Sequence, residues 1–206
     1  AVLLDFVLAE PNITLLLDTA VDGLAMADDG RTIQSLSAYC SISQTRYTLS
    51  APHFADCSGD SIVGMLCGAE FRIGKESRDE FGESNAPAEP AANLLGASLY
   101  WYSRDRGKRV PFVRPDFAID ISNSPRIRNT PFKGTIQGCK LWWLEWGGRK
   151  DTVHEAGEIK QYLTGAVYGL WDHIKNSGKY PEADNLDLEW VGPMPGKRES
   201  YRLMGP

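Results

Sequence analysis

A short polar sequence places two carboxylates, a hydroxyl and a glycine before a helix-like segment. It reads Asp56-Cys57-Ser58-Gly59-Asp60, follows the apolar step Phe54-Ala55, and precedes a run with Ile62 and Val63. Glycine lets backbone approach a ligand closely, and the first N–H groups of a helix attract anions. Carboxylates in such a turn suit ligand hydroxyls, such as those of a ribose. Equally, Asp60 could be the N-cap of the helix.

A second cluster gathers three indoles around one carboxylate in the sequence WWLEWGG, residues 142–148. Aromatic residues on a strand form core, or core on one face and a ligand wall on the other. Strand alternation places Trp142 with Leu144 on one face, and Trp143 with Glu145 on the other. A carbohydrate-binding or polysaccharide-processing module, with Trp142, Trp143 and Trp146 as its stacking platform, is therefore an alternative to simple core packing.

The remaining candidates are basic residues near the end of the chain and one histidine. Arg198 and Arg202 lie in a dense polar cluster, and arginine forks hold carboxylates or phosphates. A solvated charge run is the alternative. His173 follows Asp172, so it is either a packed histidine beside a carboxylate or a general acid or base. We expect no metal site, because the histidines are isolated and the four cysteines contain no CxxC pair.

Size and charge limit the class of protein. A chain of 206 residues is long enough for one large domain or two small ones. Its net charge is −5 and its Lys and Arg residues are scattered, which argues against nucleic acid or an anionic membrane surface as a partner. No apolar run is long enough to span a bilayer.

The first third of the chain predicts an antiparallel β-meander. Residues before Asn12 resemble the end of a helix, and Asp28-Asp29-Gly30 supplies a tight hairpin turn. A further strand is expected to enter residues 53–57. The meander itself is expected to use these β-like segments: 13–19, 21–27, 32–40 and 45–51.

The rest predicts a mixture of helix and strand. Residues 75–98 are charged and then Ala/Pro-rich, which indicates a surface excursion or a domain crossing. Segments 98–102 and 109–113 fit a hairpin, and 139–146 an aromatic strand. A long helix is expected from about Thr152, which has capping-box spacing to Glu155, to the C-cap glycine Gly178. Its apolar face repeats every three to four residues: Ile159, Leu163, Val167, Leu170 and Ile174.

Several motifs in the same order resemble one family. Asp56 to Asp60, followed by a helix and then GAEFRIGKES (residues 68–77), is similar to the second flavin-contacting segment of FAD-dependent oxidoreductases related to glutathione reductase and fumarate reductase. The later sequences WWLEWGG, DTVHEAGEI, YGLWDHIKN and PGKRES are similar to the same family. The resemblance extends through nearly all of the chain.

The resemblance implies an α+β flavoprotein. It implies a partial FAD-binding domain over residues 1–83 and a partial substrate domain over 84–206, with a small-molecule substrate. The implied cofactor-binding residues are Asp56, Ser58, Gly59, Asp60 and Gly205. As substrate-facing residues we expect Arg198 and Arg202, followed by His173 and Glu145.

Two departures from the family pattern give a further expectation. The chain lacks a GxGxxG unit, and it reads Gly205-Pro206 where the family has Gly-Asp. We therefore expect an internal fragment of a longer flavoprotein that binds FAD weakly or not at all by itself. The oligomeric state and the cellular compartment stay open.

Overall fold

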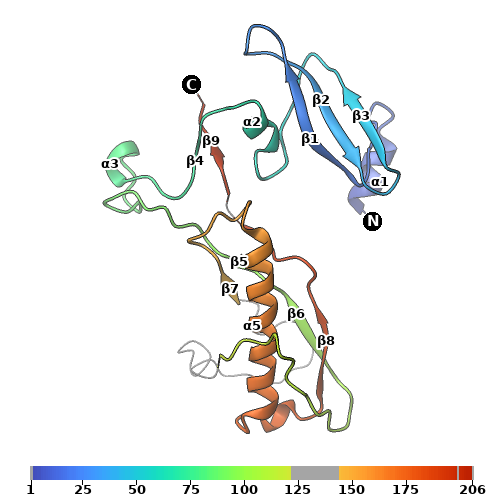
Figure 1. Ribbon diagram of the computed structural model, residues 1–206, viewed down its shortest axis with the longest axis vertical. Helices are drawn as coiled ribbons and strands as arrows, with labels where there is room; N and C mark the ends of the chain where they lie inside the picture. Colours follow the sequence, from blue (N-terminus) through green and yellow to red (C-terminus); the bar gives the residue numbers. More distant parts are fainter. Residues whose placement is uncertain (1, 122–143, 199, 206) are drawn as a thin grey trace. The chain divides into compact units, whose positions relative to one another are not determined.

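The computed structural model describes residues 2–121, 144–198 and 200–205 (Figure 1). The chain divides into two compact units, Ala1–Arg72 with Tyr201–Pro206, and Ile73–Ser200. Helices and antiparallel strands are mixed, so the predicted α+β class is confirmed. The domain boundary predicted at 83/84 stays a prediction, whereas the division into compact units falls at Arg72/Ile73.

The first unit contains the predicted meander. Helix α1 (Val2–Ala9) precedes β1 (Thr19–Met26), β2 (Ile33–Cys40) and β3 (Thr45–Leu49), which pair antiparallel in that order. The predicted hairpin turn is confirmed: Gly30 has φ 63°, and Asp29 Oδ1 accepts hydrogen bonds from the N–H groups of Arg31 and Thr32. The strand expected at 13–19 is wrong, because a turn with Asp18 at φ 52° precedes β1.

The same unit closes with a short helix and a two-stranded ribbon. Helix α2 spans Ile62–Leu66, and β4 (Phe71–Arg72) pairs antiparallel with β9 (Arg202–Leu203). Gly64 of α2 lies against Leu203, and a Cβ at this position would overlap the leucine side chain. The strand expected to enter residues 53–57 is wrong: β3 ends at Leu49 and residues 50–57 are irregular, with Pro52 unable to donate to a strand ladder.

The second unit is built around the long helix α5, Ala156–Asn176. The predicted apolar face is confirmed, since all five of its residues are buried (Ile159, Leu163, Val167, Leu170 and Ile174). The glycine expected at the end of the helix is confirmed: Gly178 follows the C-cap residue Ser177 and has φ 74°. The expected start is wrong by a few residues, because the helix begins at Ala156 with Glu155 at the N-cap position. The side chains of Asp151 and Glu155 accept N–H groups of the preceding turn.

Strand β6 (Trp101–Asp105) pairs with β8 (Leu186–Val191), and both contribute residues to the core beneath α5. The hairpin expected between 98–102 and 109–113 is therefore wrong. Strand β5 (Ala97–Ser98) pairs with β7 (Glu145–Trp146), while residues 139–143 of the predicted aromatic strand lie outside the described residues. The 3₁₀ turn η1 (Pro181–Ala183) precedes β8.

The charged segment after β4 is largely exposed, as predicted for a surface excursion. It contains the short helix α3 (Arg78–Phe81), which has no buried residue. The backbone of Lys75 and Ala91 pairs through two hydrogen bonds of 2.7 and 2.9 Å, which closes the excursion at its base.

The backbone of residues 117–119 lies directly against one side of α5. The N–H of Ile119 donates to the carbonyl oxygen of Gly165 at 3.0 Å, although that carbonyl belongs to a helix. A Cβ on Gly165 would lie 2.8 Å from the Phe117 oxygen, and one on Gly169 would overlap the Ile119 carbonyl. These two glycines therefore let an irregular segment cross the helix at backbone distance.

The crossing predicts opposite effects for two alanine substitutions in one helix. Gly169→Ala is expected to lower the free energy of unfolding by about 1–3 kcal/mol, because the added methyl group must displace the 117–119 backbone. Gly157→Ala meets no atom within 4 Å and is expected to raise it by about 0.5–1 kcal/mol through helix propensity. Urea unfolding followed by tryptophan fluorescence measures both. Equal effects of the two substitutions would contradict this account.

Candidate functional site

The side chains of Asp56 and Ser58 organise the turn before α2. Asp56 Oδ2 accepts hydrogen bonds from the N–H groups of Val63 at 2.8 Å and Gly64 at 3.1 Å. Its other oxygen accepts the Ser58 N–H at 3.0 Å. Ser58 Oγ accepts the N–H of Ile62 at 3.0 Å. Together they satisfy the first N–H groups of the helix.

This arrangement rules out the alternative in which Asp60 is the N-cap. The N-cap position is Ser61, at φ 56° and without a side-chain cap bond, and the capping oxygens come from farther upstream. The N–H groups of Ile62, Val63 and Gly64 already have acceptors, so they are not offered to a phosphate. The N-terminus of this helix therefore does not offer free N–H groups for binding an anion.

The environment of Asp56 favours its ionised form. Partial burial pushes the pKa of this carboxyl upward, but the hydrogen bonds from Ser58, Gly64 and Val63 outweigh burial and hold the pKa below its usual value of 3.8. A charged acceptor of backbone N–H groups is stronger than a neutral one. Asp56 is thus a positioning residue that holds the turn in place.

Gly59 is the part of the turn that remains open. It is exposed, has φ 81°, and an added Cβ would meet no atom within 4 Å. Ser58 is exposed beside it and Asp60 is half-buried. Gly205 is likewise exposed with open space around its Cα. The two glycines therefore have room for another group to approach their backbone closely.

The β4–β9 ribbon has one apolar and one basic face. Phe71 and Tyr201 rings lie 4.9 Å apart, and Phe71 is paired with Leu203. Arg72 and Arg202 are directly opposite each other in the register, so they share the other face. Arg72 was missed in the sequence, because only the pairing of distant segments brings it beside Arg202. Arg198 is exposed and belongs to the second unit.

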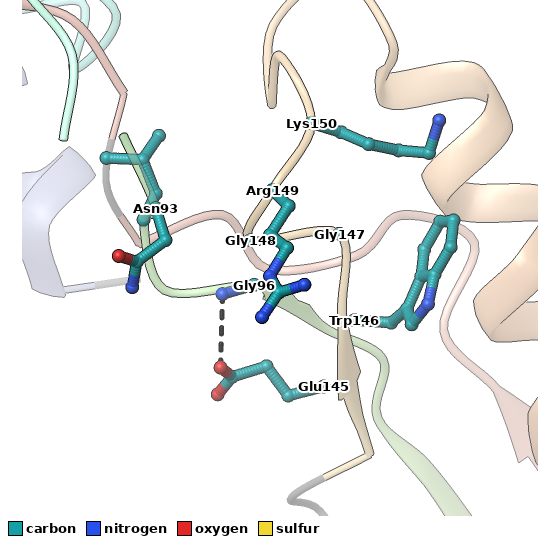
Figure 2. Close-up of a pocket in the computed structure, with 9 residues that line it drawn as sticks. Asn93, Gly96, Glu145, Trp146, Gly147, Gly148, Arg149 and Lys150 are labelled. Carbon is teal, nitrogen blue, oxygen red and sulfur yellow. Dashed lines mark hydrogen bonds between the residues drawn. The ribbon is translucent and has the colours of Figure 1, made fainter. Parts of the chain in front are cut away.

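Glu145 lines a pocket of about 460 Å³ in the second unit (Figure 2). One carboxylate oxygen accepts the N–H of Gly96 at 3.0 Å, which ties β7 to the segment leading into β5. Arg149, Lys150 and Asn93 also line this pocket. Sequence reasoning singled out Glu145 but missed these three residues, whose relation depends on two segments meeting.

Trp146 forms another wall of the pocket, and one face of its indole is covered. Its ring stacks on Tyr162 of α5 with centroids 3.9 Å apart and planes 15° from parallel. Trp142 and Trp143, the other members of the expected carbohydrate platform, lie outside the described residues. Nothing in the described part of the chain favours the carbohydrate alternative.

His173 lies in the core rather than at an opening. It is buried and packs edge-on against Tyr180 at 5.9 Å, and its Nε2 has no hydrogen-bond partner among the described residues. Burial, with the nearby charge of Lys179, lowers the pKa of this imidazole, and Asp172 and Asp120 oppose that shift only in part. His173 is about 16 Å along α5 from Tyr162, so the structure does not bring it to Glu145.

Comparison with known proteins places the chain in one family. The family model for FAD dependent oxidoreductases matches residues 1–206, and the chain therefore belongs to that family. No curated protein and no solved structure gives a match. Among the described residues no helix could cross a membrane, and no group of three or more potential ligands could hold a metal ion.

The capping role of Asp56 predicts a pH-dependent contribution to stability. Because its folded-state pKa is lowered, the stabilisation is present above about pH 4 and is lost as the pH falls through the folded pKa. Asp56→Asn is expected to lower the stability of the first unit by about 1 kcal/mol at pH 7, and by less near pH 2.5. Hydrogen exchange at the Val63 and Gly64 amides measures it.

The control for this prediction is Asp28→Asn, which changes an exposed carboxylate in the same unit. It should leave the protection of the Val63 and Gly64 amides unchanged at both pH values. A stability difference between the Asp56→Asn variant and the parent that stays equal at pH 7 and pH 2.5 would contradict the assigned role.

Proposed function

We propose that the protein serves FAD-dependent oxidation or reduction of a small molecule. The observation that carries this proposal is the family match over residues 1–206. The space around Gly59, in a turn held by Asp56 and Ser58, supports it because a dinucleotide needs close approach to the backbone. When bound, FAD supplies the hydride or electron transfer.

The first unit would hold the cofactor through the turn before α2. Gly59 lets the backbone approach the dinucleotide, while Asp56 and Ser58 keep the turn in that conformation. Asp60 and Gly205 are the further candidates for contact. Because the first N–H groups of α2 are already bonded, contact at this turn would come from the backbone around Gly59.

The substrate would be bound by arginine. Arg198 and Arg202 are exposed, and a guanidinium fork suits a carboxylate or phosphate on a small acidic molecule. The placement of Arg72 opposite Arg202 adds a second guanidinium on the same ribbon face and supports an anionic substrate. Glu145 and His173 remain weaker candidates, and His173 would need an opening of the core to reach a substrate.

The flavin proposal is tested by the visible absorption spectrum of the protein expressed from its complete reading frame, recorded beside that of this 206-residue chain. A flavin spectrum in the complete protein is the expected result. A folded complete protein that shows no flavin, even after FAD is added, would overturn the proposal.

If Gly59 contacts FAD, replacing it is expected to lower the affinity for FAD more than replacing a similar glycine elsewhere in the same unit. Gly59→Ala in the complete protein is expected to weaken FAD binding by about tenfold or more, because its methyl group occupies the space of close approach. Gly30→Ala is the matched control, since this glycine of the same unit also has a positive φ and open space around it. FAD titration by fluorescence measures both, and equal affinities would remove Gly59 from the site.

The role of Arg202 can be tested once a substrate that reduces the flavin is found. Arg202→Ala is expected to lower kcat/KM by about 10- to 100-fold through the loss of a charge-assisted hydrogen bond. Arg46→Ala, which removes an exposed arginine paired with Asp22, should leave it unchanged. Unchanged turnover in the Arg202→Ala variant would remove this residue from substrate binding.

A further inference from the structure

The pocket beside Glu145 has a rigid frame made by two segments that meet at glycines. The N–H of Leu94 donates to the Gly148 oxygen at 2.7 Å, and a Cβ on Gly148 would overlap the Leu94 carbonyl. A Cβ on Gly96 would lie 2.7 Å from the Trp146 oxygen. The frame is therefore set by close backbone contacts between these two segments.

One of the two basic residues in the pocket, Lys150, already has carboxylate partners. Lys150 Nζ lies 2.8 Å from both Glu155 and Glu158 of the adjoining helix region, and these carboxylates raise its pKa. Its charge is thus balanced by neighbours outside the pocket. Lys150 serves as part of the wall near Trp146, 5.7 Å from the indole centroid.

The charges of Arg149 and Glu145, which are opposite in sign, are not paired with another charged side chain among the described residues. Arg149 is exposed and forms no ion pair within the described residues, although it lines the same pocket as Glu145 (Figure 2). Glu145 uses one oxygen for the Gly96 N–H, and its second oxygen has no hydrogen bond to any described residue. The Asn93 amide lines the pocket and likewise has no partner among the residues described.

We propose that this pocket binds a small zwitterion, namely an α-amino acid with an uncharged side chain. A simple anion would be attracted by Arg149 but repelled by Glu145. A simple cation would be attracted by Glu145 but repelled by Arg149. A ligand with a carboxylate and an ammonium group matches both. The pocket volume of about 460 Å³ lies within the range of small-molecule sites.

Each group of the ligand has a partner of fitting chemistry. The Arg149 guanidinium binds the carboxylate, and the Asn93 amide adds a donor to it. The free oxygen of Glu145 accepts from the ammonium group. Leu94 and the Trp146 indole supply the apolar wall beside an uncharged side chain. This binding does not rest on flavin chemistry, because every group named belongs to the second unit.

The test uses the 206-residue chain without flavin. Each uncharged L-amino acid is titrated by calorimetry together with two matched analogues, the carboxylic acid that lacks the amine and the amine that lacks the carboxylate. At least one amino acid is expected to bind tenfold or more tightly than both of its analogues. Its binding should also shift the NMR signal of the Trp146 indole N–H.

Variants connect the binding to this pocket. Arg149→Gln and Glu145→Gln are each expected to weaken amino-acid binding by tenfold or more, and the glutamine at 145 keeps an acceptor for the Gly96 N–H. Arg109→Gln, at an exposed arginine that does not line the pocket, should bind like the parent chain. Circular dichroism verifies that all three variants are folded.

Three results would overturn the proposal. One is that no uncharged amino acid binds at millimolar concentration. Another is that the deaminated acid binds as tightly as the amino acid, which would define a simple anion site. The third is amino-acid binding that both pocket substitutions leave unchanged. None of these results depends on whether the complete protein holds FAD.

Discussion

Close packing against glycine, where a side chain would not fit, is the constraint on which both units depend. In the first unit, Gly64 lets α2 lie directly on Leu203 of the β4–β9 ribbon. In the second, Gly96 and Gly148 join the two segments that frame the pocket, and Gly169 admits the backbone of Ile119 against α5. At each of these positions a methyl group would have to move a neighbour, so the shape of the sites follows from the absence of side chains as much as from their presence.

Elements whose signal is local in sequence were predictable. The Asp28-Asp29-Gly30 turn fixes the hairpin of β1 and β2, and the spacing from Ile159 to Ile174 identifies the buried face of α5. Pairing across long separations was not predictable from the same information. The sequence favours a hairpin between segments 98–102 and 109–113, whereas β6 (Trp101–Asp105) pairs with β8 at residues 186–191. The side-chain pattern of a strand shows which of its faces is buried, but it does not identify the strand with which it pairs.

The candidate sites show the same limit at the level of single residues. The turn before α2 is recognisable in the sequence, and Asp60 is a reasonable N-cap candidate because a capping residue normally stands next to its helix. The structure uses Asp56, six residues before Ile62, because the turn folds its carboxylate back onto the helix N–H groups. Of the residues that line the pocket, the sequence singles out Glu145 and Trp146, but it does not indicate Asn93 and Arg149, whose roles depend on the meeting of separate segments.

The β4–β9 pairing has a consequence for synthesis of the chain. Arg72 is synthesised about 130 residues before its partner Arg202, which follows only after the whole of the second unit. Closing a flexible loop of that length costs about 4 kcal/mol of chain entropy. If the second unit folds first, its two ends take up fixed positions, and much of this loss of chain entropy has then already occurred. The order of translation therefore favours a sequence in which the second unit folds first and the first unit is completed last.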